Sequence, residues 1–253
     1  MDVEVKIERW NRWDTCSLCE QEYHSVVRCA LGWACWKTYV GRPERDGPRQ
    51  MAMNVLGLGL SDAGHHEEAL SVYEAELSMQ RRLGASEADS LVVQGNIART
   101  YSSLGRHEDA LRMSRDMYSG FVKLRGEEHE GSLGAAFLYA SSLFKLEGFD
   151  EAKSLMHKTI PVARRILGEN NDRTLRMRWL YARALCLDAG ATLDDLREAV
   201  ETLEETERIA RRVFGGAHPL VADFERTLRD ARAALRARET LAEAMASTTL
   251  GDA

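Results

Sequence analysis

The feature that most constrains this chain is a nine-residue segment, built around a glycine, that recurs at a fixed interval. Gly84, Gly126 and Gly168 stand 42 residues apart, and each is followed seven residues later by a leucine. A fourth copy, with Gly215 in the same place, is displaced by five extra residues. A period of this length indicates an architecture in which one small structural unit is stacked several times.

Between these linkers each unit has the same internal pattern. A small residue lies in a first apolar segment, a glycine marks a turn, and an alanine lies in a second apolar segment. Small residues let two helices approach closely, and glycine ends a helix at low cost in a left-handed conformation. We therefore predict a pair of antiparallel helices per unit, which buries its apolar face only by stacking on its neighbours. The repeated positions are Gly57, Ala98, Ala140 and Ala182 in the first helix, Gly64, Gly105, Gly148 and Gly190 in the turn, and Ala69, Ala110, Ala152 and Ala199 in the second helix.

This pattern resembles the tetratricopeptide repeat in the long form found in kinesin light chains. The family's linker reads leucine-glycine, two residues, then histidine-proline; Phe214 to Pro219 matches it closely, and Arg125 to His129 matches it in part. The resemblance covers about residues 51–239. It implies an all-α fold, a right-handed superhelical solenoid of antiparallel helix pairs, and a scaffold that binds other proteins. Kinesin light chains also carry a heptad segment that binds the motor, and no such pattern precedes these repeats.

We expect four parts along the chain. Residues 1–22 form a segment around a Cys-x-x-Cys pair, and residues 23–50 form a degenerate half repeat with its linker. Residues 51–239 hold four repeats and a capping helix that is rich in arginine on one face, as terminal units need a polar outer side. Residues 240–253 are expected to be a flexible tail. The half repeat also fits a fragment of a longer repeat protein.

Composition narrows the classes of partner. Hydrophobic residues make up 44% and charged residues 29% of the 253-residue chain, which is typical of a well-packed soluble protein, and the net charge of −6 argues against a dedicated nucleic-acid binder. No apolar run approaches the roughly 20 residues that span a bilayer. The first residues lack the apolar core of a secretory signal. Five cysteines, an odd number, then indicate reduced thiols and a cytoplasmic protein.

One stretch near the start raises the question of a metal. Cys16 and Cys19 would supply two thiolates from one tight turn, which is half of a tetrahedral zinc site, and His24, Cys29 or Cys35 are candidates for further ligands. The sequence from Trp13 to His24 also resembles the closing half of a RING-like or MYND-like zinc finger. That resemblance implies a second function, a zinc-dependent ubiquitin-ligase-like or regulatory adaptor whose repeats select substrates.

A structural interpretation of these cysteines stands beside the zinc hypothesis. Cys29 and Cys35 are six residues apart within Val26 to Tyr39, an apolar segment that is predicted to be a helix. Val27 also lies 42 residues before Ala69, so this helix fits the second helix of a half repeat. Free cysteines often pack in cores, and both would then be structural thiols.

Motifs of the common catalytic sites are missing from the sequence. It contains no glycine-rich phosphate loop, nucleophile elbow or dinucleotide fingerprint. His65, His66 and His107 fall at turns between helices, and Glu67 and Glu68 fall at a helix start, where negative charge favours the helix dipole. We therefore expect no catalytic residue and no cofactor apart from the zinc considered above.

A binding surface is expected on the first helices, which line the concave side in the tetratricopeptide family. In the later repeats the positions that would face this groove are aromatic and basic. Such a groove suits an extended peptide with an acidic group and a bulky apolar side chain. The alternative is that the aromatics pack against neighbouring helices and leave no groove. We expect a non-catalytic scaffold, monomeric rather than an obligate oligomer, with groove residues Asn54, Arg99, Phe137, Phe144, Lys145, Arg176, Trp179 and Arg183.

Overall fold

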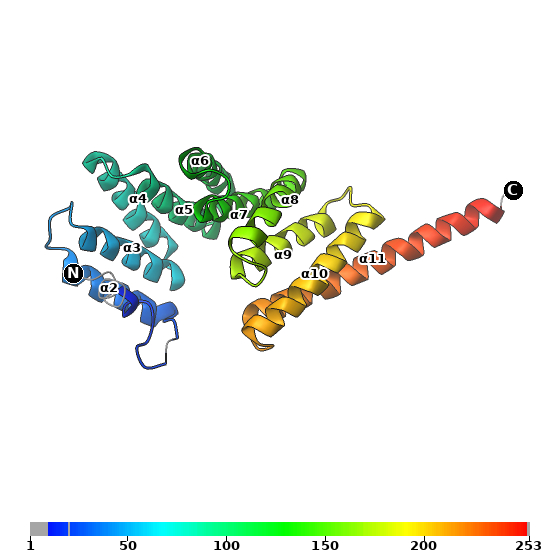
Figure 1. Ribbon diagram of the computed structural model, residues 1–253, viewed down its shortest axis with the longest axis horizontal. Helices are drawn as coiled ribbons and strands as arrows, with labels where there is room; N and C mark the ends of the chain where they lie inside the picture. Colours follow the sequence, from blue (N-terminus) through cyan, green and yellow to red (C-terminus); the bar gives the residue numbers. More distant parts are fainter. Residues whose placement is uncertain (1–9, 20, 252–253) are drawn as a thin grey trace. The chain divides into compact units, whose positions relative to one another are not determined.

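The computed structural model describes residues 10–19 and 21–251, and for 245–251 it describes the backbone alone. This part of the chain forms ten helices, α2 to α11 (Figure 1), and the helices from α2 to α5 and from α7 to α11 each pack on the next. An isolated antiparallel bridge joins Thr15 and Glu22 ahead of the first of them. The prediction of an all-α fold made of stacked helix pairs is confirmed. Within the described residues no helix is both long enough and apolar enough to cross a membrane.

The chain divides into two compact units, residues 1–120 and 121–253, and α6 (His107–Arg125) runs across their boundary. In the first unit α3 packs between α2 and α4, and α4 packs between α3 and α5. Its core contains Leu56, Tyr73 and Ile97, one residue from each of the helices α3, α4 and α5. The helices of this unit are α2 (Ser25–Tyr39), α3 (Gly47–Asp62), α4 (His66–Leu83) and α5 (Glu87–Ser103).

The second unit contains the third and fourth repeats and the last helix. Each helix from α7 to α11 packs on the next, and α9 also touches both α7 and α11. α7, α9 and α11, which each take the place of the first helix of a repeat, therefore lie side by side. Its terminal core joins Leu175, Ile209 and Phe224 from α9, α10 and α11. The helices are α7 (Glu130–Lys145), α8 (Phe149–Ile166), α9 (Asp172–Leu187), α10 (Leu193–Phe214) and α11 (Pro219–Gly251).

The recurring linker glycines adopt the conformation that their spacing predicted. Gly84, Gly126, Gly168 and Gly215 have φ angles of 65°, 82°, 95° and 83°. These angles lie in the left-handed region, where a residue with a Cβ is disfavoured. The 42-residue period is therefore the period of the chain reversals that connect one helix pair to the next.

The turn inside the third repeat differs from the prediction. Gly64 and Gly105 have φ angles of 83° and 74°, but the equivalent residue of the third repeat is Glu147, with φ 59°. Its amide donates to the carbonyl three residues earlier, as those of the two glycines do, and Gly148 comes one position later. Gly148 lies in this turn as predicted, but the left-handed position, five residues before the alanine of the second helix, is taken by Glu147.

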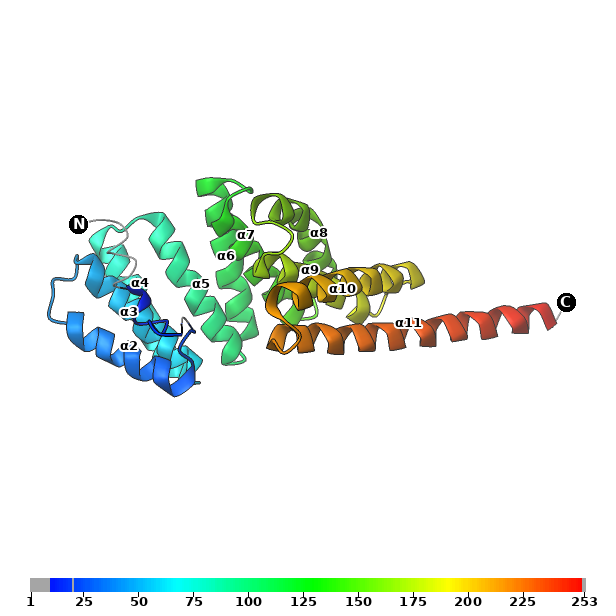
Figure 2. The same ribbon diagram turned by 60° about the horizontal axis from the view of Figure 1, so that its bottom comes forward.

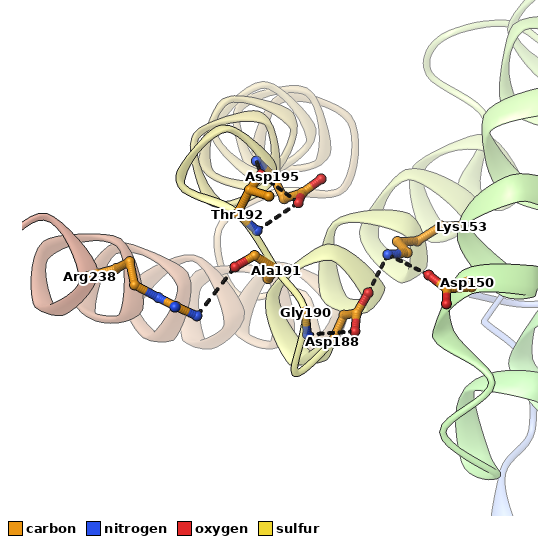
Figure 3. A network of polar contacts seen from close by, with 8 residues as sticks. All are labelled: Asp150, Lys153, Asp188, Gly190, Ala191, Thr192, Asp195 and Arg238. Atoms are coloured by element: carbon orange, nitrogen blue, oxygen red, sulfur yellow. Dashed lines mark hydrogen bonds and ion pairs between the residues drawn. The ribbon is translucent and has the colours of Figure 1, made fainter. Parts of the chain in front are cut away.

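The enlarged turn of the fourth repeat is ordered by polar contacts to two other helices (Figure 3). Asp188 accepts hydrogen bonds from the Lys153 ammonium of α8 and, at 3.0 Å, from the amide of Gly190. From the other side, the guanidinium of Arg238 on α11 donates to the carbonyl of Ala191 at 3.3 Å. The five extra residues thus form a loop that is held by its neighbours, and Gly190 does not take up the left-handed conformation of the other turns.

The helix after this loop begins with a side-chain cap. Thr192 caps α10, because its hydroxyl accepts from the amide of Asp195 at 3.1 Å while the Asp195 carboxylate accepts from the amide of Thr192 at 2.7 Å. This reciprocal pair of bonds is a capping box. Figure 3 shows the box next to the Asp188 contacts, so the loop ends directly on a fixed helix start.

Two predicted boundaries are shifted. α3 begins at Gly47 and not at residue 51, because Asp46 accepts from the amide of Arg49 at 3.2 Å and Pro48 occupies the first turn. The last helix passes Glu239 and continues to Gly251, where a tail was predicted. Alanine-rich sequence of this kind has high helix propensity. Residues 1–9 of the predicted N-terminal segment and residues 252–253 of the predicted tail lie outside the described residues.

Candidate functional site

The strongest candidate site lies on α7, α9 and α11, the helices of the second unit that take the place of the first helix of a repeat. Arg183 of α9 extends between two aromatic rings, with its guanidinium carbon 4.4 Å from the ring centre of Phe144 on α7 and 4.6 Å from that of Trp179 on α9. A guanidinium at this distance is attracted by the electron-rich faces of both rings. The arrangement joins two successive repeats through one cation.

Neighbouring residues hold the two rings in place. The indole nitrogen of Trp179 donates to the hydroxyl of Thr227 on α11 at 2.9 Å, and its ring lies 5.8 Å from that of Phe224. Phe144 meets Phe149 edge to face at 5.3 Å. Both aromatics therefore pack against neighbouring helices, as the alternative interpretation held. They are nevertheless only half-buried, so part of each ring still faces solvent.

The charge of Arg183 is not balanced by a direct partner. Burial lowers the pKa of its guanidinium, Arg226 lowers it further, and Asp223 opposes the change. An arginine remains charged at neutral pH in spite of such a shift. Among the residues that the structure describes, none makes a hydrogen bond or ion pair with Arg183. The N–H groups at the edge of its guanidinium are therefore without a polar partner among these residues.

Other predicted groove residues are placed differently. Arg176 is ion-paired with Asp172 at 2.8 Å, Phe137 is half-buried on α7, and Lys145 is exposed at the end of that helix. Asn54 and Arg99 lie on α3 and α5 of the first unit, where Arg99 donates to the side chain of Asn96. Of the eight predicted residues, the structure brings Phe144, Trp179 and Arg183 together in direct contact.

The sequence analysis missed the contribution of α11 to this site. Thr227 and Phe224 fix Trp179, and Asp223 and Arg226 act on the charge of Arg183, yet α11 was interpreted only as a cap. A usable signal was present, because Gly168 and Gly215 are the linker glycines of consecutive repeats. That offset makes α11 the next first helix, which places it beside α9.

The structure does not support the zinc hypothesis. In the part of the chain that it describes, no group of three or more histidine, cysteine, aspartate or glutamate side chains is placed to hold a metal ion. Cys35 is fully buried in a cluster with Tyr39, Ala52 and Val55, and Cys29 packs against the core of the first unit. These two thiols therefore serve packing.

That turn has chemistry of its own. The amides of Leu18 and Cys19 donate to the sulfur of Cys16 and lower the pKa of its thiol to about 7. The amide of Cys16 donates to the carbonyl of Gln21 at 2.9 Å, which closes the turn. Two thiols alone make half of a zinc site, and the described residues add no third ligand to them.

Comparisons with known proteins agree with the repeat pattern. Residues 49–120 match the tetratricopeptide repeat family. No curated protein sequence matches the chain significantly. Among solved structures, a candidate kinesin light chain from Podosopora anserina with nearly identical TPR-like repeats is similar, with a TM-score of 0.64 and 21% identity. The match covers 80% of this chain and 93% of that one.

Two further solved structures share the fold. BtubC (BKLC) from P. vanneervenii has a TM-score of 0.62 at 15% identity, over 86% of this chain and 91% of that chain. A Rap protein in complex with Competence and Sporulation Factor has a TM-score of 0.54 at 16% identity, over 83% of this chain and 59% of that one. Residues 49–120 thus match tetratricopeptide repeats, and the chain has a fold like that of these solved structures.

Proposed function

We propose that this protein is a non-catalytic scaffold that binds an extended segment of a partner protein on the face formed by α7, α9 and α11. The observation that carries the proposal is Arg183, which is held between Phe144 and Trp179 and has no polar partner within the described residues. A half-buried charge without a partner costs free energy in the absence of a ligand. A ligand of opposite charge recovers that cost.

The chemistry of the partner follows from this arrangement. The edge of the guanidinium carries two parallel N–H groups that have no polar partner in the described residues and that match the two oxygens of a carboxylate. The exposed parts of Phe144 and Trp179 offer apolar area next to that edge, and tryptophan and arginine are typical of residues that dominate binding energy. The proposed ligand is therefore a peptide segment with an acidic group beside a bulky apolar side chain.

Two further observations support this function. The similar Rap protein was solved in complex with Competence and Sporulation Factor, so a fold of this kind holds a partner in that case. All five cysteines of the chain are free thiols, which fits the reducing cytoplasm as the place of action. We favour this function over the zinc-dependent adaptor, because no third metal ligand accompanies Cys16 and Cys19 in the described residues.

The test compares two arginines on the same helix. Fluorescein-labelled peptides that pair one acidic residue with one aromatic residue, and matched peptides with the acid replaced by its amide, are screened by fluorescence polarisation. Arg183→Gln is expected to weaken the best acidic peptide about tenfold or more, since charged hydrogen bonds contribute about 1.5–3 kcal/mol. Arg176→Gln is the control, because Arg176 is already paired with Asp172.

Two results would contradict the proposal. One is equal affinity for acidic peptides and their amide counterparts across the whole set. The other is an Arg183→Gln variant that binds as tightly as the parent while Arg176→Gln loses binding. Circular dichroism of both variants shows that the helices are intact in either case.

A further inference from the structure

Two of the five cysteines meet on one turn of the chain. Residues 17–19 form this turn, and the thiol of Cys19 donates a hydrogen bond to the sulfur of Cys16, so the two sulfur atoms lie within reach of each other. Cys19 is exposed, Cys16 is half-buried, and Leu18 between them is 93% exposed. Both thiols are free. A reagent in solution can therefore reach a pair of adjacent thiols here.

The donors around this pair converge on one of the two sulfurs. The amides of Leu18 and Cys19 both donate to the sulfur of Cys16. The hydroxyl of Tyr23 donates to the same atom. Hydrogen bonds to sulfur favour the thiolate, which is the form of cysteine that attacks a disulfide. This geometry makes Cys16 the nucleophile of the pair and leaves Cys19 as the thiol beside it.

The backbone next to the turn is tied to the fold. The amide of Tyr23 donates to the carbonyl of Asp14 at 2.7 Å, next to the antiparallel bridge between Thr15 and Glu22. The carboxylate of Asp14 is in turn ion-paired with Arg28 of α2 at 3.2 Å. The two thiols are therefore held near each other before any reaction, which raises the effective concentration of one at the other.

The other three cysteines are in different surroundings. Cys35 is fully buried, and Cys29 packs against the core of the first unit. Burial raises the pKa of the Cys35 thiol to about 12 and that of the Cys186 thiol to about 11. Buried thiols of this kind are inert. They serve as controls within the same chain.

We propose that Cys16 and Cys19 are a reversible redox site, which a low-molecular-weight disulfide such as glutathione disulfide oxidises to a disulfide within the turn. The thiolate of Cys16 attacks one sulfur of glutathione disulfide, the S–S bond of that molecule breaks, and one glutathione thiolate leaves. Cys19 then gives its proton to water and attacks the sulfur of Cys16. The bond between Cys16 and glutathione breaks, and the second glutathione thiolate leaves.

The balance of this exchange is complete. The cysteine pair loses two protons and two electrons, and the two glutathione thiolates take them up as two molecules of glutathione. In a reducing compartment such a bond is transient, so the oxidised fraction follows the ratio of glutathione disulfide to glutathione. The reaction involves none of α7, α9 and α11, so it is independent of the peptide-binding function.

Mass spectrometry of the full chain provides the test. The protein is treated with glutathione disulfide at neutral pH with a chelator present, and the remaining thiols are alkylated after unfolding in urea. The parent is expected to lose two hydrogens and to be protected from alkylation at Cys16 and Cys19, whereas the other three cysteines are alkylated. Excess glutathione is expected to restore both thiols. Cys186→Ser is the control and is oxidised like the parent.

Two single variants identify the attacking thiol. Cys19→Ser is expected to collect one glutathione on Cys16, and Cys16→Ser is expected to collect it on Cys19 about fivefold more slowly or less. Circular dichroism shows that both variants keep their helices. Three results overturn the proposal: a parent that retains a bound glutathione and forms no bond within the turn, equal rates in the two variants, or protection of a buried cysteine as fast as that of the pair.

Discussion

Glu147 is a single residue that carries avoidable backbone strain. Its φ of 59° is left-handed, a conformation that costs a residue with a Cβ roughly 1–2 kcal/mol, and the equivalent residues of the first two repeats are Gly64 and Gly105. Glu147→Gly removes this cost, although it adds freedom to the unfolded chain. We expect a net gain of about 0.5–1 kcal/mol in the free energy of unfolding.

Urea denaturation followed by circular dichroism measures this change. Glu147→Ala is the matched control, because it removes the carboxylate and keeps the Cβ in the left-handed conformation. If the alanine variant is stabilised as much as the glycine variant, the gain comes from the lost charge and the strain argument is wrong.

Glu76 is a buried carboxyl group in the core of the first unit. It is 3% exposed, and Gln80 donates to one of its oxygens at 3.4 Å, while the other oxygen has no partner in the described residues. Burial raises the pKa of Glu76 from 4.5 to about 8. The third and fourth repeats have the buried hydroxyls of Thr159 and Thr206 at the same distance from their alanines.

The raised pKa of Glu76 makes stability depend on pH. Below pH 4.5 the group is protonated in both states, and between 4.5 and about 8 the unfolded chain releases a proton that the folded chain keeps. The free energy of unfolding therefore falls across this range by an amount on the order of a few kcal/mol. Glu76→Gln is expected to be equal to the parent near pH 4.5 and increasingly more stable toward pH 8.

Urea denaturation at a series of pH values checks this expectation. Glu67→Gln, at an exposed position of the same helix, should leave the pH dependence as it is in the parent. A Glu76→Gln variant whose stability falls with pH in parallel with the parent would mean that the carboxyl is hydrated in the folded protein.

At the scale of helices and loops, the sequence predicted what a local backbone requirement dictates. The four linker glycines were identified from spacing alone, because a left-handed linker strongly favours glycine. The sequence pattern did not reveal Glu147, because the stacking of its repeat tolerates a strained residue there and backbone strain cannot be read from the sequence.

Contacts between distant elements were harder to predict. The loop after α9 is ordered by Lys153 and Arg238, which lie 35 and 47 residues from their partners Asp188 and Ala191. The sequence showed only that five residues had been added. In the same way, it placed Phe144, Trp179 and Arg183 on first helices, but their stacking on one another depends on side-chain directions that the repeat pattern does not contain.

At the scale of the whole molecule, α11 covers the apolar end of the second unit. Leu220, Val221 and Phe224 of α11 cover the end of the second unit by packing against Leu175 and Ile209. Burial of each large apolar side chain is worth about 1.5–3 kcal/mol. A chain shortened after Phe214 loses all three and also leaves Trp179 without its partner Thr227, so we expect it to lose several kcal/mol or to fail to fold its last repeat.

A chain shortened after Glu239 provides the comparison. It keeps every residue of α11 that is buried in the described part of the chain, and Thr240 to Ala244, which it loses, are exposed, so its stability should match that of the full chain. Urea denaturation of the three chains measures both effects, and the slope of the transition shows whether the last repeat still unfolds with the rest. A loss of stability in the chain shortened after Glu239 would show that the end of α11 covers part of its own unit, contrary to the exposure of Thr240 to Ala244. The views in Figures 1 and 2 show this end of α11 extending past the start of α10.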